Sequence, residues 1–349
     1  MISGEPSSLL YIFWNLSLIS MRTLKLAYEF SLYGLDPSLL KEYSTKPSDF
    51  LKGYGFSSAF TKKDENLMEE LRDAGISVYV EVPLFVGELL WKKFPRSRPI
   101  TEEGEPLEKV EWYAGVNPSV PEVRKFCSEK VRRAAKLPVN GVWLDFIRWP
   151  CRWESPSPRL VQTSFDDLTI ELFSRDTGIE VPQINPKERA SFIIKNYLEE
   201  WTDWKCRQIT SFVSEARKIL GSDKKLGMFL VPWKSEDYNG AIRSIIGQDV
   251  EELKEYVDVF SPMVYHAMCG KPVEWISDVT SWVWKKTGKE VLPIIQVADV
   301  PRRLSDEEIE LALEAAISVR GSKGVIIFSM RHLNEKKLEV IARKIRQLG

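Results

Sequence analysis

Eight short β-rich runs recur along the 349-residue chain, and helical patterns separate most of them. Several of these runs are almost continuously apolar, which is typical of parallel strands that are covered by helices. The runs begin at Leu24, Tyr54, Ile76, Gly141, Gly227, Val257, Val291 and Gly324. Strand–helix alternation repeated eight times predicts an α/β fold of the closed (β/α)8, or TIM, barrel type.

The spacing of the runs predicts two long insertions. The runs that start at Tyr54 and Ile76 lie 22 residues apart, which is the length of a plain strand–helix unit. The steps that follow the third and fourth runs are longer by tens of residues, so we expect insertions at about 84–119 and 150–186. Long loops that follow the strands of such a barrel build its catalytic face.

The first twenty residues differ from the rest of the chain. They contain a 12-residue apolar run, but no basic residue precedes it and no small-residue cleavage site follows. The run is also too short to span a bilayer. We therefore expect an N-terminal extension at 1–20, with Met21 as a candidate start, and a single barrel domain at 21–349 of a cytoplasmic protein that does not enter a membrane.

Composition excludes several classes of function. The formal net charge is −1, from 49 basic and 50 acidic residues, and gives no global field that attracts nucleic acid. The four cysteines form no C-x-x-C pair and only two histidines are present, which disfavours a zinc site or a disulfide framework. Nucleotide-binding glycine motifs and a G-x-S-x-G elbow are absent from the sequence. We therefore expect no cofactor and no metal; the charge-rich, Asn- and Gln-poor composition suits a heat-adapted protein.

The fourth run carries an acidic residue at its end. Side chains alternate along a strand, so Val142 and Leu144 are expected to face the helices. Trp143 and Asp145 then point into the barrel, with Asp145 at the catalytic rim. A carboxylate there is costly unless it is solvated, paired or functional. The structural alternative is that Asp145 simply forms an ion pair with Arg148 or another cation.

The same run resembles a known signature. "GVWLDFIRWP", residues 141–150, is similar to the [VI]-x-[LF]-D-[FY]-[IV]-R-[FWY]-P motif of glycosyl-hydrolase-like TIM-barrel families. "NPSVPEV" at 117–123 and "VDVFSPMVYH" at 257–266 resemble further segments of these families. The resemblance extends from about Leu24 to the C-terminus. It implies a carbohydrate-active barrel with the aspartate of the fourth strand, Asp145, in the active site.

Glycoside hydrolysis normally needs a second carboxyl group. Glu81 shares the inward parity of the third run and neighbours Asp145, whereas Glu236 and Asp299 follow the fifth and seventh runs. Glu29 has the inward parity of the first run and is assigned to substrate binding near the same rim. The structural alternatives are a buried hydrogen-bonded network for Glu29 and Glu81 and a solvated loop for Glu236. The carboxyl separation, and hence a retaining or inverting outcome, stays open.

Several other side chains of the predicted rim suit a sugar ligand. Arg148 follows Asp145, Tyr265 and His266 end the sixth run, and Gln296 is a polar residue in the apolar seventh run. For His266 the structural alternative is a hydrogen-bonded histidine without a catalytic role. Four tryptophans lie in or next to the predicted loops, where an aromatic face can stack on a sugar ring: Trp112, Trp149, Trp153 and Trp233.

Three functions compete at this point. The first is a glycoside hydrolase that acts on an oligo- or polysaccharide through a carboxylate pair that includes Asp145. The second is a non-catalytic barrel that binds a glycan on the same aromatic rim. The third is a metal-assisted hydrolase or lyase with Glu29, Glu81 and Asp145 as ligands. A hydrolase needs two carboxyl groups about 5–10 Å apart across an open cleft. The oligomeric state stays open.

Overall fold

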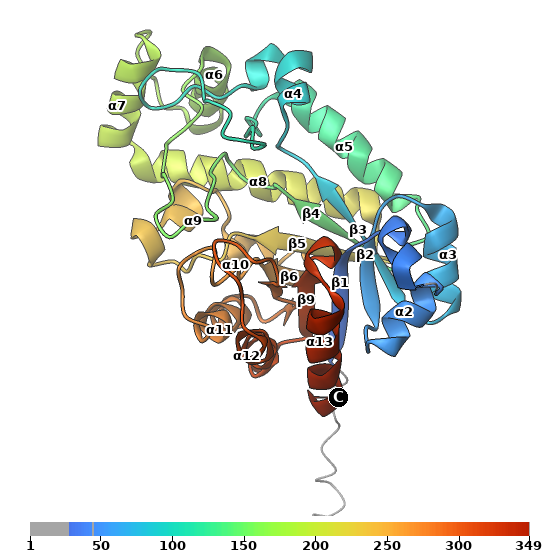
Figure 1. The fold of residues 1–349 in the computed structure, drawn as a ribbon. Coiled ribbons are helices and arrows are strands. Elements are labelled where there is room, and N and C mark those ends of the chain that lie inside the picture. Colours follow the sequence, from blue (N-terminus) through green and yellow to red (C-terminus); the bar gives the residue numbers. More distant parts are fainter. Residues whose placement is uncertain (1–27, 44, 349) are drawn as a thin grey trace, which may run out of the picture.

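The computed structural model describes residues 28–43 and 45–348, so the expected extension at 1–20 lies outside the described residues. Strands and helices alternate along the chain (Figure 1). The strands are β1 (Glu29–Leu35), β2 (Ser58–Thr61), β3 (Ser77–Pro83), β4 (Gly141–Asp145), β5 (Lys225–Leu230), β6 (Val259–Pro262), β7 (Glu290–Val291), β8 (Ile294–Gln296) and β9 (Gly324–Phe328).

The helices fill the intervals between these strands. They are α2 (Pro47–Gly53), α3 (Glu65–Asp73), α4 (Glu88–Lys93), α5 (Pro121–Ala135), α6 (Asp167–Thr177), α7 (Pro186–Asn196), α8 (Leu198–Leu220), α9 (Ala241–Ser244), α10 (Val250–Leu253), α11 (Trp275–Thr287), α12 (Asp306–Ile317) and α13 (Glu335–Leu348). Short 3₁₀ turns occur at Pro37–Tyr43, Pro95–Ser97, Asp237–Asn239 and Met330–His332. In Figure 1 the helices surround the sheet on its outer side.

The strands of the described chain form one parallel sheet. Their order is β7-β6-β5-β4-β3-β2-β1-β9-β8. The two ends of this order, β7 and β8, are separated along the chain only by Leu292 and Pro293. Isolated parallel bridges pair Met263 with Ile294 and Val291 with Ser322. The sheet is therefore strongly curled, with the amino ends of all strands on one side and the carboxyl ends on the other.

The predicted seventh strand is divided into β7 and β8. Pro293 lies between them and has no backbone N–H, so it cannot donate a ladder hydrogen bond at that position. Its carbonyl still accepts a hydrogen bond from the N–H of Ile326 at 2.8 Å. The proline thus interrupts the strand without removing the chain from the sheet.

The first strand lies further along the chain than the run that begins at Leu24. Part of that run, 24–27, falls outside the described residues, and β1 begins at Glu29, which pairs with Gly324. The alternation continues through Ser31 and Tyr33 and ends at Gly34, whose φ of 75° suits a residue without a Cβ. Glu29 therefore lies at the end of the sheet opposite the predicted rim, and Tyr33 lies near the carboxyl end.

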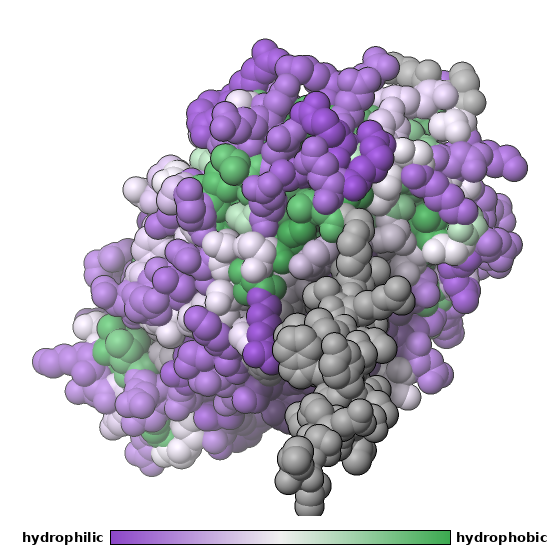
Figure 2. All heavy atoms as spheres, turned by 90° about the horizontal axis from the view of Figure 1, so that it is seen from below, coloured by the Kyte–Doolittle hydropathy of each residue, from purple (hydrophilic) through white to green (hydrophobic). Residues whose placement is uncertain are grey.

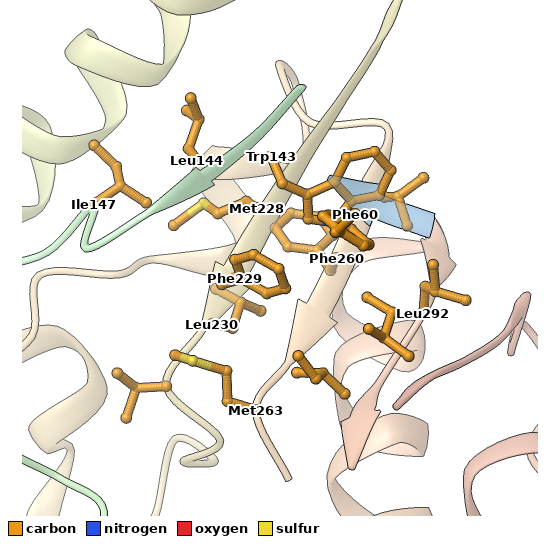
Figure 3. Close-up of a cluster of buried hydrophobic side chains, with 14 of the residues drawn as sticks. Phe60, Trp143, Leu144, Ile147, Met228, Phe229, Leu230, Phe260, Met263 and Leu292 are labelled. Atoms are coloured by element: carbon orange, nitrogen blue, oxygen red, sulfur yellow. The ribbon is translucent and has the colours of Figure 1, made fainter. Parts of the chain in front are cut away.

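Large side chains fill the inside of the curl. Trp143 on β4 contacts Phe60 on β2, with ring centroids 5.3 Å apart (Figure 3). It also contacts Tyr79 on β3, at 4.4 Å. Its indole N–H donates a hydrogen bond to Ser261 Oγ at 3.0 Å. Gly227 on β5 leaves room for the indole, because a Cβ there would meet Trp143 at 2.0 Å. This aromatic layer closes the space beneath the carboxyl ends of the strands.

Two long segments follow β3 and β4. The segment at 84–120 contains α4, and the segment at 146–197 contains α6 and α7. Figure 1 shows α4, α6 and α7 together at one end of the molecule. An antiparallel bridge between Thr101 and Thr163 joins the two segments directly. They therefore form one continuous structure at the end of the sheet that the carboxyl ends of β3 and β4 reach.

The outer surface has few large apolar side chains. The face seen in Figure 2 is mainly hydrophilic, with small and separate hydrophobic areas. The longest helix, α8, has 23 residues and is amphipathic, with charged residues along its exposed side. Within 28–43 and 45–348, no helix is long and apolar enough to cross a membrane.

Candidate active site

A cavity of about 1040 Å³ opens at the carboxyl ends of the strands. Tyr33, Glu81, Asp145 and Phe229 line it from β1, β3, β4 and β5. The two long segments that follow β3 and β4 contribute further lining residues, as do the loops after β6, β8 and β9. A cavity of this size accommodates a ligand larger than a single sugar ring.

Two carboxyl groups meet in the cavity. Asp145 ends β4 and Glu81 lies on the adjacent β3, where it pairs in the ladder with Trp143. Both side chains point to the inside of the sheet, as the alternation along each strand predicted. The two carboxyl groups share a hydrogen bond. The N–H of Phe146 donates to Asp145 Oδ1 at 2.7 Å, and the hydroxyl of Tyr33 donates to Glu81 Oε2. The predicted pair therefore comes together, as a hydrogen-bonded dyad.

The environment of the dyad favours a bound proton. Burial, followed by the negative charge of Glu81, raises the pKa of Asp145 well above its ordinary range. Arg148 acts in the opposite direction but does not reverse the effect. Burial and the carboxyl charges also raise the pKa values of Tyr33 and Tyr265, which stay protonated. Asp145 therefore keeps its proton to a higher pH than an ordinary aspartate does, as expected for a buried carboxyl group beside a second one.

This raised pKa makes stability depend on pH. As pH rises, the unfolded chain loses the Asp145 proton before the folded chain does, so the folded state becomes less stable. We expect Asp145→Asn to unfold at a temperature about 2 °C or more above wild type at pH 7. The difference should shrink as pH falls and disappear below about pH 3, where the unfolded carboxyl also keeps its proton. Thermal unfolding between these pH values measures it, and a less stable variant at pH 7 would contradict the assignment.

Phe146 follows the dyad in an unusual backbone conformation, and Arg148 lies two residues further on. Phe146 has a φ of 50°, which is rare for a bulky residue and costs about 1–3 kcal/mol. This turn directs the Phe146 N–H at Asp145 and carries the phenyl ring under the Arg148 guanidinium, 4.7 Å from its centroid. The ion pair between Asp145 and Arg148, which was the structural alternative to a functional role, does not form within the described residues. Arg148 is buried and lines the cavity.

Tyr265 also lines the cavity, as predicted for substrate binding. Its ring stacks between Trp153, at 5.7 Å, and Phe328, at 5.0 Å. Trp153 itself is fully buried and does not line the cavity. Stacking on these two rings therefore holds the side chain of Tyr265 in place.

The other two predicted carboxylates lie away from the dyad. Glu236 is exposed and forms an ion pair with Lys234 at 3.1 Å. Asp299 accepts a hydrogen bond from the Leu304 N–H at 3.0 Å and pairs with Lys337. Its own backbone N–H, followed by Lys234, lowers the pKa of Glu236, and the Leu304 N–H, followed by Lys337, lowers the pKa of Asp299. Neither carboxyl group therefore keeps a proton to donate. Neither side chain lines the cavity.

Two predicted tryptophans are packing residues. Trp149 is fully buried, and its indole N–H donates to the carbonyl of Lys205 at 3.0 Å. Trp233 is buried against Tyr238, with ring centroids 4.8 Å apart. Neither lines the cavity, and the Trp149 indole points to α8 instead.

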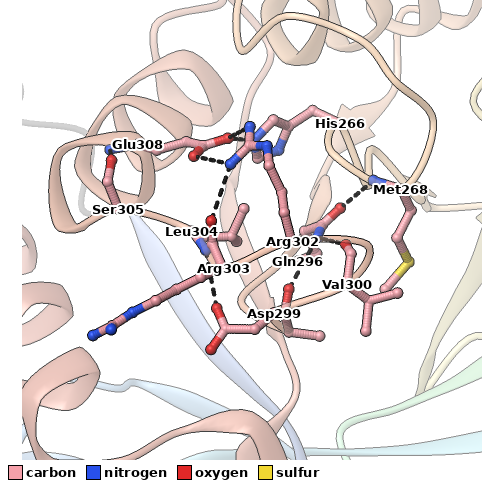
Figure 4. Close-up of polar contacts among 11 residues, drawn as sticks. His266, Met268, Gln296, Asp299, Val300, Arg302, Arg303, Leu304, Ser305 and Glu308 are labelled. Atoms are coloured by element: carbon pink, nitrogen blue, oxygen red, sulfur yellow. Dashed lines mark hydrogen bonds and ion pairs between the residues drawn. The ribbon is translucent and has the colours of Figure 1, made fainter.

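His266 and Gln296 hold loops instead of reaching the cavity (Figure 4). His266 Nε2 lies 2.8 Å from Glu308 Oε1 on α12, and Arg302 pairs with the same carboxylate. Gln296 accepts a hydrogen bond from the Met268 N–H and donates to the Val300 carbonyl at 2.9 Å. Because Met268 and Val300 line the cavity, Gln296 shapes the site indirectly.

Several cavity residues were not among the sequence candidates. Tyr33 was missed because the first strand was placed too early. Glu154 lies on the segment after β4, is half-buried and has no hydrogen bond or ion pair among the described residues. Trp112, predicted as a rim aromatic, lines the cavity and is 57% exposed. No local signal in the sequence marks Glu154, since its loop has no regular periodicity.

The carboxylates required by the metal-assisted alternative do not assemble. Glu29 lies at the amino end of β1, where it pairs in the ladder with Gly324. Glu81 and Asp145 lie toward the carboxyl ends of their strands. Among residues 28–43 and 45–348, no three His, Cys, Asp or Glu side chains lie close enough to hold a metal ion.

The curled parallel sheet and the carboxyl dyad at its carboxyl edge define a class of protein, the α/β folds that resemble glycoside hydrolase barrels. The chain belongs to the family described as "Putative glycosyl hydrolase domain", whose sequence profile matches residues 42–281. This match confirms the resemblance to glycosyl hydrolase families, whereas the motif at 141–150 stays a prediction. A comparison with curated proteins finds no match.

Solved structures share this fold at low sequence identity. The glycoside hydrolase domain of PgaB (BpsB) from Bordetella bronchiseptica superposes with a TM-score of 0.68 and 14% identity, over 91% of this chain and 98% of that chain. The β-galactosidase from the psychrophilic Marinomonas ef1 gives a TM-score of 0.63 and 9% identity, over 92% and 59%. That from Rahnella sp. R3 gives 0.62 and 12%, over 93% and 56%. The chain thus spans somewhat over half of the β-galactosidases, and the similarity concerns the fold.

Proposed function

We propose that this protein is a glycoside hydrolase that cleaves an oligo- or polysaccharide, with Asp145 as its general acid. The observation that carries the proposal is the proton-sharing dyad of Asp145 and Glu81 in a cavity of about 1040 Å³. Membership of a glycosyl hydrolase family supports the same reaction class. The raised pKa of Asp145 favours proton donation over the roles of nucleophile or general base.

The proposed step moves one proton. The Asp145 carboxyl donates its proton to the glycosidic oxygen while the bond from that oxygen to the anomeric carbon breaks. The Asp145 carboxylate that remains accepts the Phe146 N–H and is close to the Arg148 charge. Water adds to the anomeric carbon, and the proton that it releases restores the dyad. Glu81, held by Tyr33, keeps the proton on the dyad between turnovers.

The dyad serves as one acid in this proposal. Carboxyl groups in a direct hydrogen bond lie closer than the roughly 5–10 Å that separates the two catalytic carboxyls of most glycosidases. The second carboxyl group is assigned to Glu154, which lines the same cavity and has no partner among the described residues. Glu154 would accept the proton of the attacking water or attack the sugar itself, according to its distance from the bound anomeric carbon.

The finer architecture forms part of the proposal. If β7 and β8 count as one strand that Pro293 interrupts, the described chain contains eight parallel strands in barrel order. Residues 21–349 would then form a single (β/α)8 barrel, with insertions after the third and fourth strands. These insertions contribute Trp112, Arg148 and Glu154 to the cavity, which agrees with the position of active sites in such barrels.

Trp112 provides an aromatic surface for a sugar ring in this proposal. It is 57% exposed at the cavity rim, and its ring contacts Phe146 edge-on at 6.0 Å. Trp112→Ala should raise KM about 10-fold and leave kcat and Tm nearly unchanged, because the lost contact is equally strong in ground and transition states. Steady-state kinetics and thermal unfolding measure these effects. A variant with altered kcat and unaltered KM would contradict a binding role.

The test of function is a turnover screen with binding measured alongside. Wild type and Asp145→Asn are incubated with a broad panel of oligo- and polysaccharides, and new reducing ends are quantified. We expect wild type to cleave at least one member and Asp145→Asn to bind it without cleavage. The direct hydrogen bond within the dyad also favours a second candidate, a non-catalytic glycan-binding barrel. Wild type that binds a glycan without turnover would support that candidate instead.

A further inference from the structure

Arg148 is a buried cation without an acceptor. It is 2% exposed and lines the cavity, yet its side chain forms no hydrogen bond or ion pair with any described residue. Its guanidinium lies over the ring faces of Phe146, at 4.7 Å, and Tyr113, at 5.9 Å. The Nε atom is buried with no partner. The small surface that remains accessible belongs to the cavity.

The other buried cations of the described chain each have at least one acceptor, although Arg189 shares with Arg148 a buried Nε that has none. Arg189 donates to the carbonyls of two residues and pairs with Asp167 at 2.9 Å. Lys205 donates to three oxygens between 2.8 and 3.2 Å. Lys337 and Lys344 each contact an acidic side chain. A buried charge is costly unless it is paired and hydrogen-bonded, so the empty donors of Arg148 are an exception that calls for a partner.

The rest of the cavity carries unpaired positive charge. Arg159 and Arg331 line it and have no ion pair within 28–43 and 45–348, whereas Arg152 is neutralised by Glu111 at 2.8 Å. Against three unpaired arginines stand the charge of Glu154 and the one charge that Glu81 and Asp145 share. The cavity therefore attracts an anion, although the whole chain has a net charge of only −1.

We propose that the cavity recognises an acidic saccharide, whose carboxylate or sulfate group is bound by the Arg148 guanidinium. This inference rests on the proposed glycoside hydrolase function and names its substrate class. A guanidinium binds a planar carboxylate or a sulfate through two parallel N–H donors. Because Arg148 follows Asp145 by three residues and is electrostatically close to it, the acidic group lies on a sugar at or next to the cleavage point.

The experiment compares charged glycans with neutral counterparts of the same linkage. Oligogalacturonate and oligoalginate are titrated calorimetrically into Asp145→Asn, which we expect to bind without cleavage. Their carboxyl-reduced forms are titrated in the same way. Sulfated galactan oligosaccharides and their desulfated forms make up the second arm, which separates sulfate from carboxylate recognition. We expect at least one charged member to bind about 10–100-fold more tightly than its neutral counterpart.

Variants at position 148 assign the effect to one side chain. In an Asp145→Asn background, Arg148→Met should bring charged and neutral affinities together, and Arg148→Lys should restore part of the difference. Arg132→Met, an exposed arginine of α5 paired with Glu129, is the matched control and should keep the full difference. Arg148→Met should also unfold at or above the wild-type temperature, because it removes an unpaired buried charge.

Three outcomes overturn the inference. Equal binding of charged and neutral glycans rejects the acidic substrate class but leaves the hydrolase intact, since the turnover screen tests that separately. A charge preference that survives Arg148→Met assigns it to another residue. The third outcome concerns Arg148→Met made in the wild-type background. If this variant only shifts the pH–rate profile, and does so equally on charged and neutral glycans, Arg148 affects the pKa of Asp145 and does not bind the substrate. Turnover without a charge preference would thus reject only the acidic substrate class. Absence of turnover would instead reject the proposed hydrolase.

Discussion

Asp145→Asn is expected to lower kcat by about 10²–10⁴-fold on the glycan that wild type cleaves, with little change in binding. The amide preserves the shape of the side chain and removes the transferable proton. In wild type the acid must be protonated, so kcat should fall as pH rises through the raised pKa of Asp145. This alkaline limb should be absent from the residual activity of the variant. Steady-state kinetics across pH measure both effects.

The matched controls are the two acids that the sequence also suggested. Glu236→Gln and Asp299→Asn make the same chemical change at exposed carboxylates that form ion pairs outside the cavity. Both should retain wild-type kcat and the same pH profile. If Asp299→Asn lost activity while Asp145→Asn retained it, the dyad would be a structural feature and the catalytic acid would follow the seventh strand. Equal activity of all three variants with wild type would remove carboxylates at these positions from the chemistry.

The part of the site on regular strands could be predicted from the sequence. The alternation in "VWLDFI" sends Trp143 and Asp145 inward because successive side chains of a strand point to opposite faces. The same rule places Glu81 inward on β3, and parallel pairing of adjacent strands then brings the two acids together. Strand parity is a local property, so a short stretch of sequence is sufficient to define it.

The part of the site on long segments could not be predicted in the same way. Trp149 and Arg148 are adjacent in sequence, yet Trp149 packs against α8 and Arg148 lines the cavity. Which of them reaches the rim depends on the positive φ of Phe146 and on how the segment folds over α8. Glu154 likewise depends on the tertiary path of its loop. No periodicity encodes these paths, because they are set by contacts between residues distant in sequence.

Buried polar groups show a second limit of sequence reasoning. His266 and Gln296 have the residue types and strand-end positions of ligand-binding groups, and both instead satisfy protein partners. Glu308 on α12 and the carbonyl of Val300 come from other parts of the chain. A side chain that binds substrate and one that secures a loop therefore cannot be told apart until their partners are known. The missing partner of Arg148 is likewise visible only in three dimensions.

Trp143→Ala should have the largest effect on stability, a loss of about 3–5 kcal/mol in the free energy of unfolding. The indole is fully buried inside the curl, contacts Tyr79 and Phe60, and donates a hydrogen bond to Ser261. Its removal leaves a cavity directly beneath the dyad and an unpaired hydroxyl. Urea denaturation measures the loss, and kcat should fall as well, because β4 carries both Trp143 and Asp145.

The matched control makes the same substitution at the surface. Trp112→Ala removes an exposed indole and should change the free energy of unfolding by no more than about 0.5 kcal/mol. Gly227→Ala tests the packing from the other side, since its Cβ would lie 2.0 Å from Trp143 and should cost about 1–3 kcal/mol. Combined with Trp143→Phe, whose smaller ring leaves room for that methyl group, Gly227→Ala should cost less than the two changes summed. Strict additivity would mean that a side chain at position 227 and the indole of Trp143 do not compete for the same space. The packing of Trp143 beneath the dyad would then not depend on Gly227.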